Sequence, residues 1–134
     1  RCTGGRDQKG KPMINVKDEV YAALCTVTEN VTDYYPRSWE QDLSIQYMEE
    51  DNKVAEETAK GETKSYVRYR IDIWSRKSTS AAAVAVDAAI SPLGLKRTQC
   101  MDVEDPSGLK HKQMRYEGII DVRSRQVYHT IGKE

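Results

Sequence analysis

Lys64-Ser-Tyr-Val-Arg-Tyr-Arg-Ile-Asp-Ile-Trp-Ser75 has the clearest strand pattern in the sequence. Successive side chains of a strand point to opposite faces, so its residues divide into two sets. The apolar set is Val67, Tyr69, Ile71 and Ile73, and the amphipathic set is Tyr66, Arg68, Arg70, Asp72 and Trp74. The apolar face needs a covering element, so we predict that this strand lies at the centre of a small α+β domain.

A covering helix is predicted directly after this strand, over residues 78–90. The segment begins with hydroxyl residues suited to capping a helix and continues with alanine, the strongest helix former. Pro92 and Gly94 then end it. Small residues spaced at i, i+3, i+4 and i+7 predict the stripe that faces the sheet, against which Ile71 and Ile73 should be buried. The residues of this stripe are Ala81, Val84, Ala85 and Ala88.

The remaining patterns predict a further helix at 16–29 and a series of strands. Alternating apolar residues indicate strands at about 42–49, 95–103, 110–122 and 127–129, with a turn at 105–108. Residues 31–36 form only a short extended piece. The predicted order is therefore α-β-β-α-β-β-β. It favours an α+β fold with a mainly antiparallel β-sheet and two α-helices packed on one face.

Residues 50–63 separate the first two main strands and are long for a hairpin connection, where about 2–5 residues are usual. The segment is either a long loop or a hairpin arm in which both strands continue outward. It is rich in acids and has almost nothing to bury. Such segments in compact domains tend to be functional or disordered, and we expect this one to contact a neighbouring subunit.

Length and composition set broad limits. The 134 residues suit one domain, which we assign to 13–134, after a flexible basic N-terminal tail at 1–12. Lysine plus arginine equals aspartate plus glutamate at 21 each, so the net charge favours no particular partner. The three cysteines show no CxxC spacing and predict reduced thiols in a cytosolic assembly. No apolar run approaches the roughly 20 residues of a membrane helix, so no membrane partner is expected.

Catalytic and metal-binding motifs are missing from the sequence. There is no GxSxG motif, no Walker loop and no GxGxxG motif. Neither His111 nor His129 has an acid or a cysteine nearby at a metal-ligand spacing. We therefore expect no enzymatic activity, no catalytic residue, no metal and no cofactor.

Basic and aromatic residues on the predicted sheet offer an alternative function, a small nucleic-acid-binding module. The basic residues are Arg68, Arg70, Lys110, Lys112, Arg115, Arg123 and Arg125, with Tyr66 and Trp74 among them. Three acids, Asp72, Glu117 and Asp121, interrupt this pattern. A solvated or subunit-contacting sheet face explains the same residues.

Several short motifs follow one another in a characteristic order over residues 14–129. They are Tyr35-Pro36, Trp39, Ile45-Gln-Tyr47, Glu50, Asn52, Ile71-Asp-Ile-Trp74, the alanine-rich helix, Gly94-Leu-Lys-Arg97, His111, Met114-Arg-Tyr-Glu-Gly118, Asp121 and Val127-Tyr128. Their order and spacing resemble the tail completion (tail-to-head joining) proteins of long-tailed bacteriophages, which are similar to tail terminators. Leu43 departs from the family, which often has proline just before the first sheet strand.

This resemblance implies a structural virion protein that is assembled in the host cytoplasm and located in the tail or neck. Such proteins form a hexameric ring at the head-proximal end of the tail tube. The implied partners are other copies of the chain, the tail tube protein and the head completion or connector protein, and double-stranded DNA passes through the lumen without sequence recognition. A closed ring needs heterologous contacts between subunits. The expected interface residues are Glu50, Asp51, Asn52, Glu56, Glu57, Glu62, Arg68, Arg70, Trp74 and Arg115.

Overall fold

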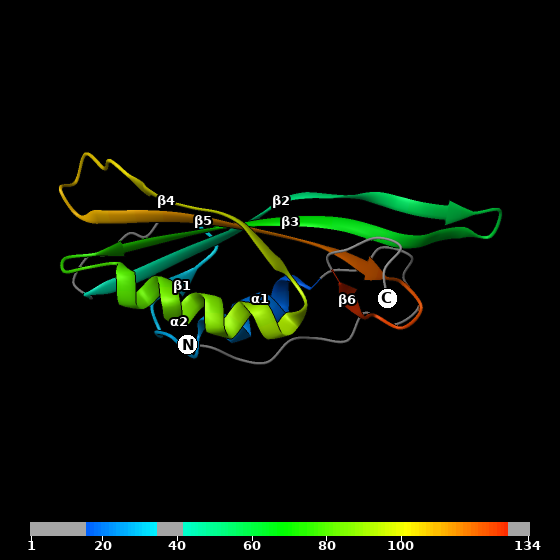
Figure 1. Ribbon diagram of the computed structural model, residues 1–134, viewed down its shortest axis with the longest axis horizontal. Helices are drawn as coiled ribbons and strands as arrows, with labels where there is room; N and C mark the ends of the chain where they lie inside the picture. Colours follow the sequence, from blue (N-terminus) through cyan, green and yellow to red (C-terminus); the bar gives the residue numbers. More distant parts are fainter. Residues whose placement is uncertain (1–15, 35–41, 129–134) are drawn as a thin grey trace.

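A mixed β-sheet with both helices on one face makes up the part of the chain that the computed structural model describes, residues 16–34 and 42–128 (Figure 1). The predicted α+β class is confirmed. The predicted basic tail at 1–12 lies outside the described residues. So do Tyr35, Pro36 and Trp39, which contribute to the family resemblance.

The first helix and the first strand differ from the prediction. The elements are α1 (Lys17–Leu24), β1 (Val31–Thr32), β2 (Leu43–Thr58), β3 (Gly61–Ser75), α2 (Ser80–Ile90), the 3₁₀ turn η1 (Ser91–Leu93), β4 (Lys96–Val103), β5 (Lys110–Asp121) and β6 (Val127–Tyr128). Helix α1 ends early because the Thr26 hydroxyl and amide both donate to the Ala23 carbonyl, at 2.6 and 3.1 Å. Strand β1 is missing from the predicted order, since a two-residue strand has no periodicity.

Strand β3 lies at the centre of the sheet, as predicted. The strand order is β1-β2-β3-β5-β4, and β6 also pairs with β5. Strand β3 is antiparallel to both β2 and β5, whereas β1 is parallel to β2. The four residues of its apolar face, Val67, Tyr69, Ile71 and Ile73, are all 0% exposed. The alternation in the sequence therefore identified the core-facing side of the strand.

The face that α2 turns to the sheet differs from the prediction. Its buried residues are Ala82, Ala83, Val86 and Ile90. The predicted stripe of Ala81, Val84, Ala85 and Ala88 is exposed, and Val84 is 71% exposed. The helix is apolar on nearly every side, so the spacing of its small residues did not distinguish one face from another. The side chain that orients it is Asp87, whose Oδ1 accepts a hydrogen bond of 2.7 Å from the Tyr116 hydroxyl on β5.

The cysteines also correct a prediction. Cys25 is disulfide-bonded, whereas Cys100 is free and exposed. The prediction that all three thiols are reduced is therefore wrong for Cys25. An odd number of cysteines leaves at least one thiol without a disulfide partner in its own chain, but it does not require every thiol to be unpaired.

Residues 50–63 continue strands β2 and β3 as a paired hairpin. The strands remain in antiparallel register from Leu43 opposite Ser75 to Thr58 opposite Gly61, where Gly61 has a φ of 125° that favours glycine. We call residues 55–64, beyond the opposed pair Val54 and Ser65, the distal hairpin. None of its residues is buried, and it extends beyond the other strands at one end of the sheet (Figure 1).

Candidate functional site

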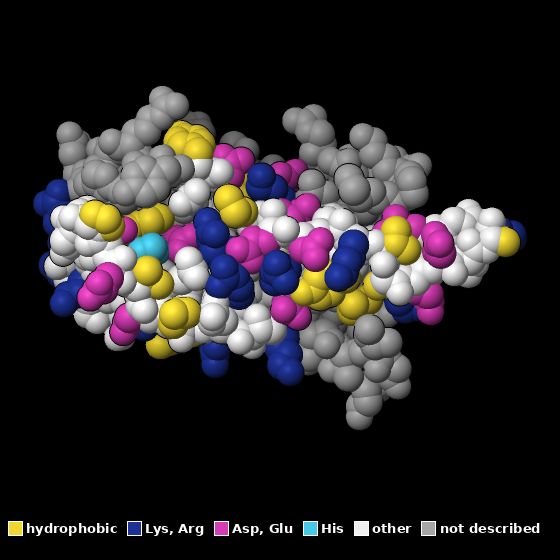
Figure 2. Space-filling model, turned by 90° about the horizontal axis from the view of Figure 1, so that it is seen from above, with side chains coloured by type: hydrophobic (Ala, Val, Ile, Leu, Met, Phe, Trp, Pro, Cys, Tyr) yellow, Lys and Arg dark blue, Asp and Glu magenta, His cyan; other side chains and the backbone are white. Residues whose placement is uncertain are grey.

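The face of the sheet opposite the helices, which we call the open face, carries a concentration of charged side chains. Lys and Arg side chains alternate with Asp and Glu side chains along its middle (Figure 2). The register places Arg70 of β3 directly opposite Arg115 of β5, and Asp72 opposite Gln113. Like charges directly opposite one another destabilise a sheet. The two arginines therefore require an anion beside them.

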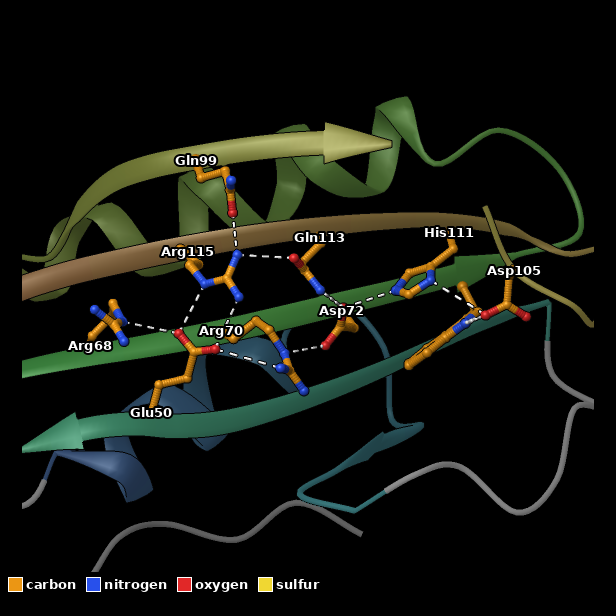
Figure 3. Close-up of polar contacts among 10 residues, drawn as sticks. Glu50, Arg68, Arg70, Asp72, Gln99, Asp105, His111, Gln113 and Arg115 are labelled. Atoms are coloured by element: carbon orange, nitrogen blue, oxygen red, sulfur yellow. Dashed lines mark hydrogen bonds and ion pairs between the residues drawn. The ribbon is translucent and has the colours of Figure 1, made fainter. Parts of the chain in front are cut away.

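Glu50 supplies this anion from the neighbouring strand. The register of β2 against β3 shifts between Glu49 and Asp51, so Glu50 is the extra residue of a β-bulge. It has no directly opposing residue in β3. Its carboxylate lies among three guanidinium groups that come from β3 and β5 (Figure 3). A bulge at this position thus inserts one acid into a set of three arginines.

The contacts around Glu50 are short and only partly open to solvent. Arg115 binds its carboxylate in a bidentate manner, with Nε 2.9 Å from Oε1 and a terminal nitrogen 3.1 Å from Oε2. Arg68 Nε donates to Oε1 at 3.0 Å, and Arg70 lies 3.5 Å from Oε2. Bidentate arginine–carboxylate pairs are among the strongest hydrogen-bonded pairs in proteins. The hydrogen bonds from Arg115 are the main reason why the pKa of Glu50 lies below its ordinary value.

Asp72 extends the same network toward the other end of the sheet. Its side chain is 4% exposed and accepts Arg70 Nε at 2.9 Å and Gln113 Nε2 at 3.1 Å. The Gln113 carbonyl accepts a hydrogen bond of 3.0 Å from Arg115, and Gln99 on β4 accepts another. The network therefore crosses the open face from β2 to β4 and holds the three arginines in place. We call Glu50, Asp72 and the three arginines the arginine cluster.

The network ends at a stacked pair, His111 and Trp74. The two rings are 4.5 Å apart at an angle of 23°, and His111 Nε2 lies 2.9 Å from Asp72 Oδ1. Trp74 Nε1 donates to Asp105 Oδ1 at 3.1 Å, and His111 Nδ1 is 3.4 Å from the same oxygen, without hydrogen-bond geometry. Burial opposes ionisation of Asp105, but hydrogen bonds from Ser107 and Trp74 hold its pKa below the ordinary value. These contacts anchor the predicted 105–108 turn to the open face.

The predicted interface residues divide into three groups. The structure brings Glu50, Arg68, Arg70 and Arg115 together in the arginine cluster. Asp51 lies opposite Arg68, Asn52 donates to Glu49 at 3.4 Å, and the acids Glu56, Glu57 and Glu62 lie on the distal hairpin. Trp74 is 3% exposed, so its ring packs within its own chain and is not accessible to another molecule.

Sequence reasoning missed the polar residues that connect the cluster. The sequence pattern presents Asp72 as an interruption of a basic face, and His111 as a histidine with no acid nearby at a metal-ligand spacing. In the structure Asp72 is instead the acceptor shared by Arg70, Gln113 and His111. These contacts depend on the pairing register of β3 and β5, and the sequence pattern does not specify that register.

Two further acids, Asp51 and Glu117, lie opposite Arg68 on its two neighbouring strands, and each has a lysine beside it, Lys53 and Lys96 respectively. The arginine cluster and these four neighbours together keep one net positive charge, since five basic side chains face four carboxylates. The side chains of Arg68, Arg70 and Arg115 are 37%, 25% and 27% exposed, so each guanidinium is partly accessible from outside. A fixed, partly exposed set of guanidinium groups is suited to binding one further oxyanion, either a carboxylate or a phosphate. No group of three or more potential metal ligands occurs in residues 16–34 and 42–128.

The distal hairpin has the opposite electrostatic character. Glu57 lies directly opposite Glu62 across the hairpin, an arrangement that destabilises a strand pair. Glu56 is compensated, since Lys64 Nζ lies 2.7 Å from its carboxylate and the Thr63 hydroxyl donates to it at 2.8 Å. Mainly through the hydrogen bond from Lys64, the pKa of Glu56 lies below its ordinary value. The hairpin therefore carries two opposed acids without a cation between them, Glu57 and Glu62, of which Glu62 accepts a hydrogen bond from the Ser65 hydroxyl.

Comparison of the sequence with protein families and curated proteins assigns no relative. The chain matches no protein-family model and no curated protein. Among the helices of the described residues, none is both long and apolar enough to cross a membrane.

Proposed function

We propose that this protein is a structural, non-enzymatic virion protein that forms a hexameric ring at the head-proximal end of a phage tail tube. In this role it joins the tail tube protein to the head completion or connector protein, and double-stranded DNA passes through its lumen. Assembly takes place in the host cytoplasm, and the finished ring lies in the neck of the virion. The proposal extends the resemblance of the sequence motifs, and one observation in the structure supports it most.

That observation is the distal hairpin, which buries none of its own side chains. Ordering a residue costs about 1–2 kcal/mol of backbone entropy, and burial of apolar surface normally offsets this cost. The hairpin gains little of that kind from its own domain. A contact outside the chain would account for its length and its charge, and a ring would repeat that contact once in every subunit. Exposed ion pairs are individually weak, so this repetition matters.

The alternative function, nucleic-acid binding through the basic-aromatic face, is less well supported. Glu50 and Asp72 offset two of the three arginine charges, and Trp74 is covered by its own chain. A surface that reads phosphates in DNA normally uses many uncompensated basic residues. The two functions differ in a DNA-binding titration. A ring should bind duplex DNA weakly, whereas a phosphate-reading module should show a steep loss of affinity as salt increases.

Shortening the hairpin tests the ring directly. Residues 55–64 are replaced by Asn-Gly, a dipeptide suited to a two-residue turn between the opposed residues Val54 and Ser65. The removed residues are not buried, and the sheet contacts that are lost are confined to Thr63 and Lys64, which pair with Val122 and Asp121, so thermal unfolding of the variant should fall only slightly below that of the parent. Ring formation, measured by sedimentation and electron microscopy at increasing concentration, should be lost.

A conservative change in the same turn, Ala59→Ser, serves as the control and should leave the ring intact. Rings of normal size formed by the shortened variant would remove the hairpin from the mechanism. A parent protein that stays monomeric at every concentration, alone and with a tail tube, would contradict the proposed function itself.

A further inference from the structure

The distal hairpin and the arginine cluster have complementary charges but cannot meet within one chain. Glu57 follows Glu50 by seven residues along the same extended strand, which corresponds to about 23 Å at the usual rise of a strand. Strand β2 stays paired with β3 throughout this distance, so it does not fold back on itself. Any contact between the two sites must therefore involve a second molecule.

Electrostatic repulsion between two acids on the distal hairpin favours the binding of a cation there. Glu57 and Glu62 oppose one another directly, and Lys64, the nearest basic residue on β3, is already bound to Glu56. The Glu62 carboxylate accepts a hydrogen bond from the Ser65 hydroxyl, which does not neutralise its charge. Among the described residues, no ion pair joins Glu57 or Glu62 to a basic side chain. A guanidinium group placed between these two carboxylates would remove their repulsion.

The positive charge at the arginine cluster correspondingly favours the binding of an acid. The one surplus positive charge of the cluster and the four charged residues beside Arg68 (Lys53, Asp51, Glu117 and Lys96) would be neutralised by a single additional carboxylate. Arg68 is the most exposed of the three arginines at 37%, and it lies on the side of the cluster nearest the hairpin. Its guanidinium is oriented by a hydrogen bond of 3.0 Å to Glu50, so little side-chain entropy is lost when it binds a partner.

We propose that the distal hairpin of one subunit docks on the arginine cluster of a second copy of this chain. This inference rests on the proposed ring and names the surface that receives the hairpin. Glu57 and Glu62 of one subunit contact Arg68, and through it the rest of the cluster, on the next. Each subunit presents a different patch at each side of the contact, so the interface is heterologous and can close into a ring.

Charge exchange between the two sites provides the test. Glu57→Lys and Arg68→Glu each place like charges across the proposed contact, so each should weaken self-association at least tenfold. The double variant restores opposite charges in reversed order and should recover most of the parental affinity. Self-association is measured by sedimentation equilibrium at two salt concentrations, and the parental affinity should fall as salt increases.

Arg68→Glu also brings a new acid close to Glu50, so a second variant protects the test against misfolding. Arg68→Gln leaves Glu50 with Arg70 and Arg115 and should fold like the parent, as judged by thermal unfolding. It should weaken assembly less than Arg68→Glu does. The matched control is Lys77→Glu, an exposed charge change in the loop after β3, at the end of that strand away from the hairpin, which should have no effect on assembly.

The outcomes separate this inference from the proposed function. Loss of assembly in Glu57→Lys without loss in Arg68→Glu, and without rescue in the double variant, would overturn the docking site while the ring stands. A parent that does not assemble under any condition would overturn both. Reduced binding of duplex DNA by Arg68→Gln, with assembly unchanged, would assign the cluster to nucleic acid and overturn the inference.

Discussion

A single carboxylate, Glu50, determines whether the open face is a stable arrangement. Arg70 and Arg115 lie directly opposite one another, which alone would destabilise the pairing of β3 and β5. The Glu50 carboxylate contacts both of them and Arg68 as well, and its side chain is only 13% exposed. The bulge at this residue gives its carboxylate room among the arginines, because no residue of β3 lies opposite it.

Replacing Glu50 by glutamine therefore should destabilise the protein. Glu50→Gln removes the negative charge but keeps the shape, so Arg68 and Arg115 lose their shared carboxylate and only the Asp72 ion pair of Arg70 remains. We expect the free energy of unfolding in urea at pH 7 to fall by about 1–2 kcal/mol, the usual range for hydrogen bonds that involve charged groups, reduced for partial exposure.

Glu57→Gln is the matched control for this substitution, because Glu57 lies on the same strand but opposes another acid, Glu62. Its stability should stay unchanged or increase slightly. Equal destabilisation by the two substitutions would show that the contacts of Glu50 contribute nothing beyond those of an ordinary surface acid.

At the scale of an element, helix α2 illustrates how one polar contact selects a helix face. Both the exposed and the buried sides of α2 are apolar, so hydrophobicity alone gives little preference between them. Asp87 resolves this ambiguity. It accepts a hydrogen bond from Tyr116 and lies 3.0 Å from Arg97, both on the sheet. The larger side chains Val86 and Ile90 then enter the core.

Two valines in α2 provide a direct test of this orientation. Val86 is 0% exposed and Val84 is 71% exposed, although they are two residues apart in the same helix. Val86→Ala should create a small cavity and lower the free energy of unfolding by about 2 kcal/mol. Val84→Ala should change it by less than about 0.5 kcal/mol, as is usual for surface sites. The reverse order in chemical denaturation would show that the helix presents the predicted alanine stripe to the sheet after all.

At the scale of the whole molecule, ionised carboxylates connect elements that are distant in sequence. Glu50 joins β2 to β3 and β5, and Asp87 joins α2 to β4 and β5. Asp105 joins the β4–β5 turn to β3, and Asp121 accepts the Ser124 amide in the turn before β6. The pKa of each of these groups lies below its ordinary value. Hydrogen bonds to the ionised form are the main reason for Glu50, Asp87 and Asp121, and for Asp105 they outweigh the opposing effect of burial.

These lowered pKa values predict loss of stability in acid. Each group is more acidic in the folded chain than in the unfolded one, so the unfolded state takes up protons first as the pH falls. Stability should be fully present at neutral pH and should decline below about pH 4.5, the ordinary range of these carboxyls. Urea unfolding between pH 7 and pH 3 measures the decline. The slope should be smaller in Glu50→Gln, and a parental stability that stays constant down to pH 3 would contradict the prediction.

The sequence by itself determined the features that follow from local periodicity. Strand β3 has two distinct faces because its side chains alternate, and all four predicted core residues of that strand are buried. The turn at 105–108 and the end of α2 before Gly94 likewise follow from local backbone preferences. These features depend only on residues that are neighbours along the chain.

The tertiary structure alone decided which residues of different elements meet. The face of α2 depends on a hydrogen bond between Asp87 and Tyr116, which are 29 residues apart. The arginine cluster depends on Arg115 reaching Glu50, 65 residues away, through a register that includes a bulge. A shift of one residue in that register would move every side chain of the strand to the other face, so no local pattern could have specified these contacts.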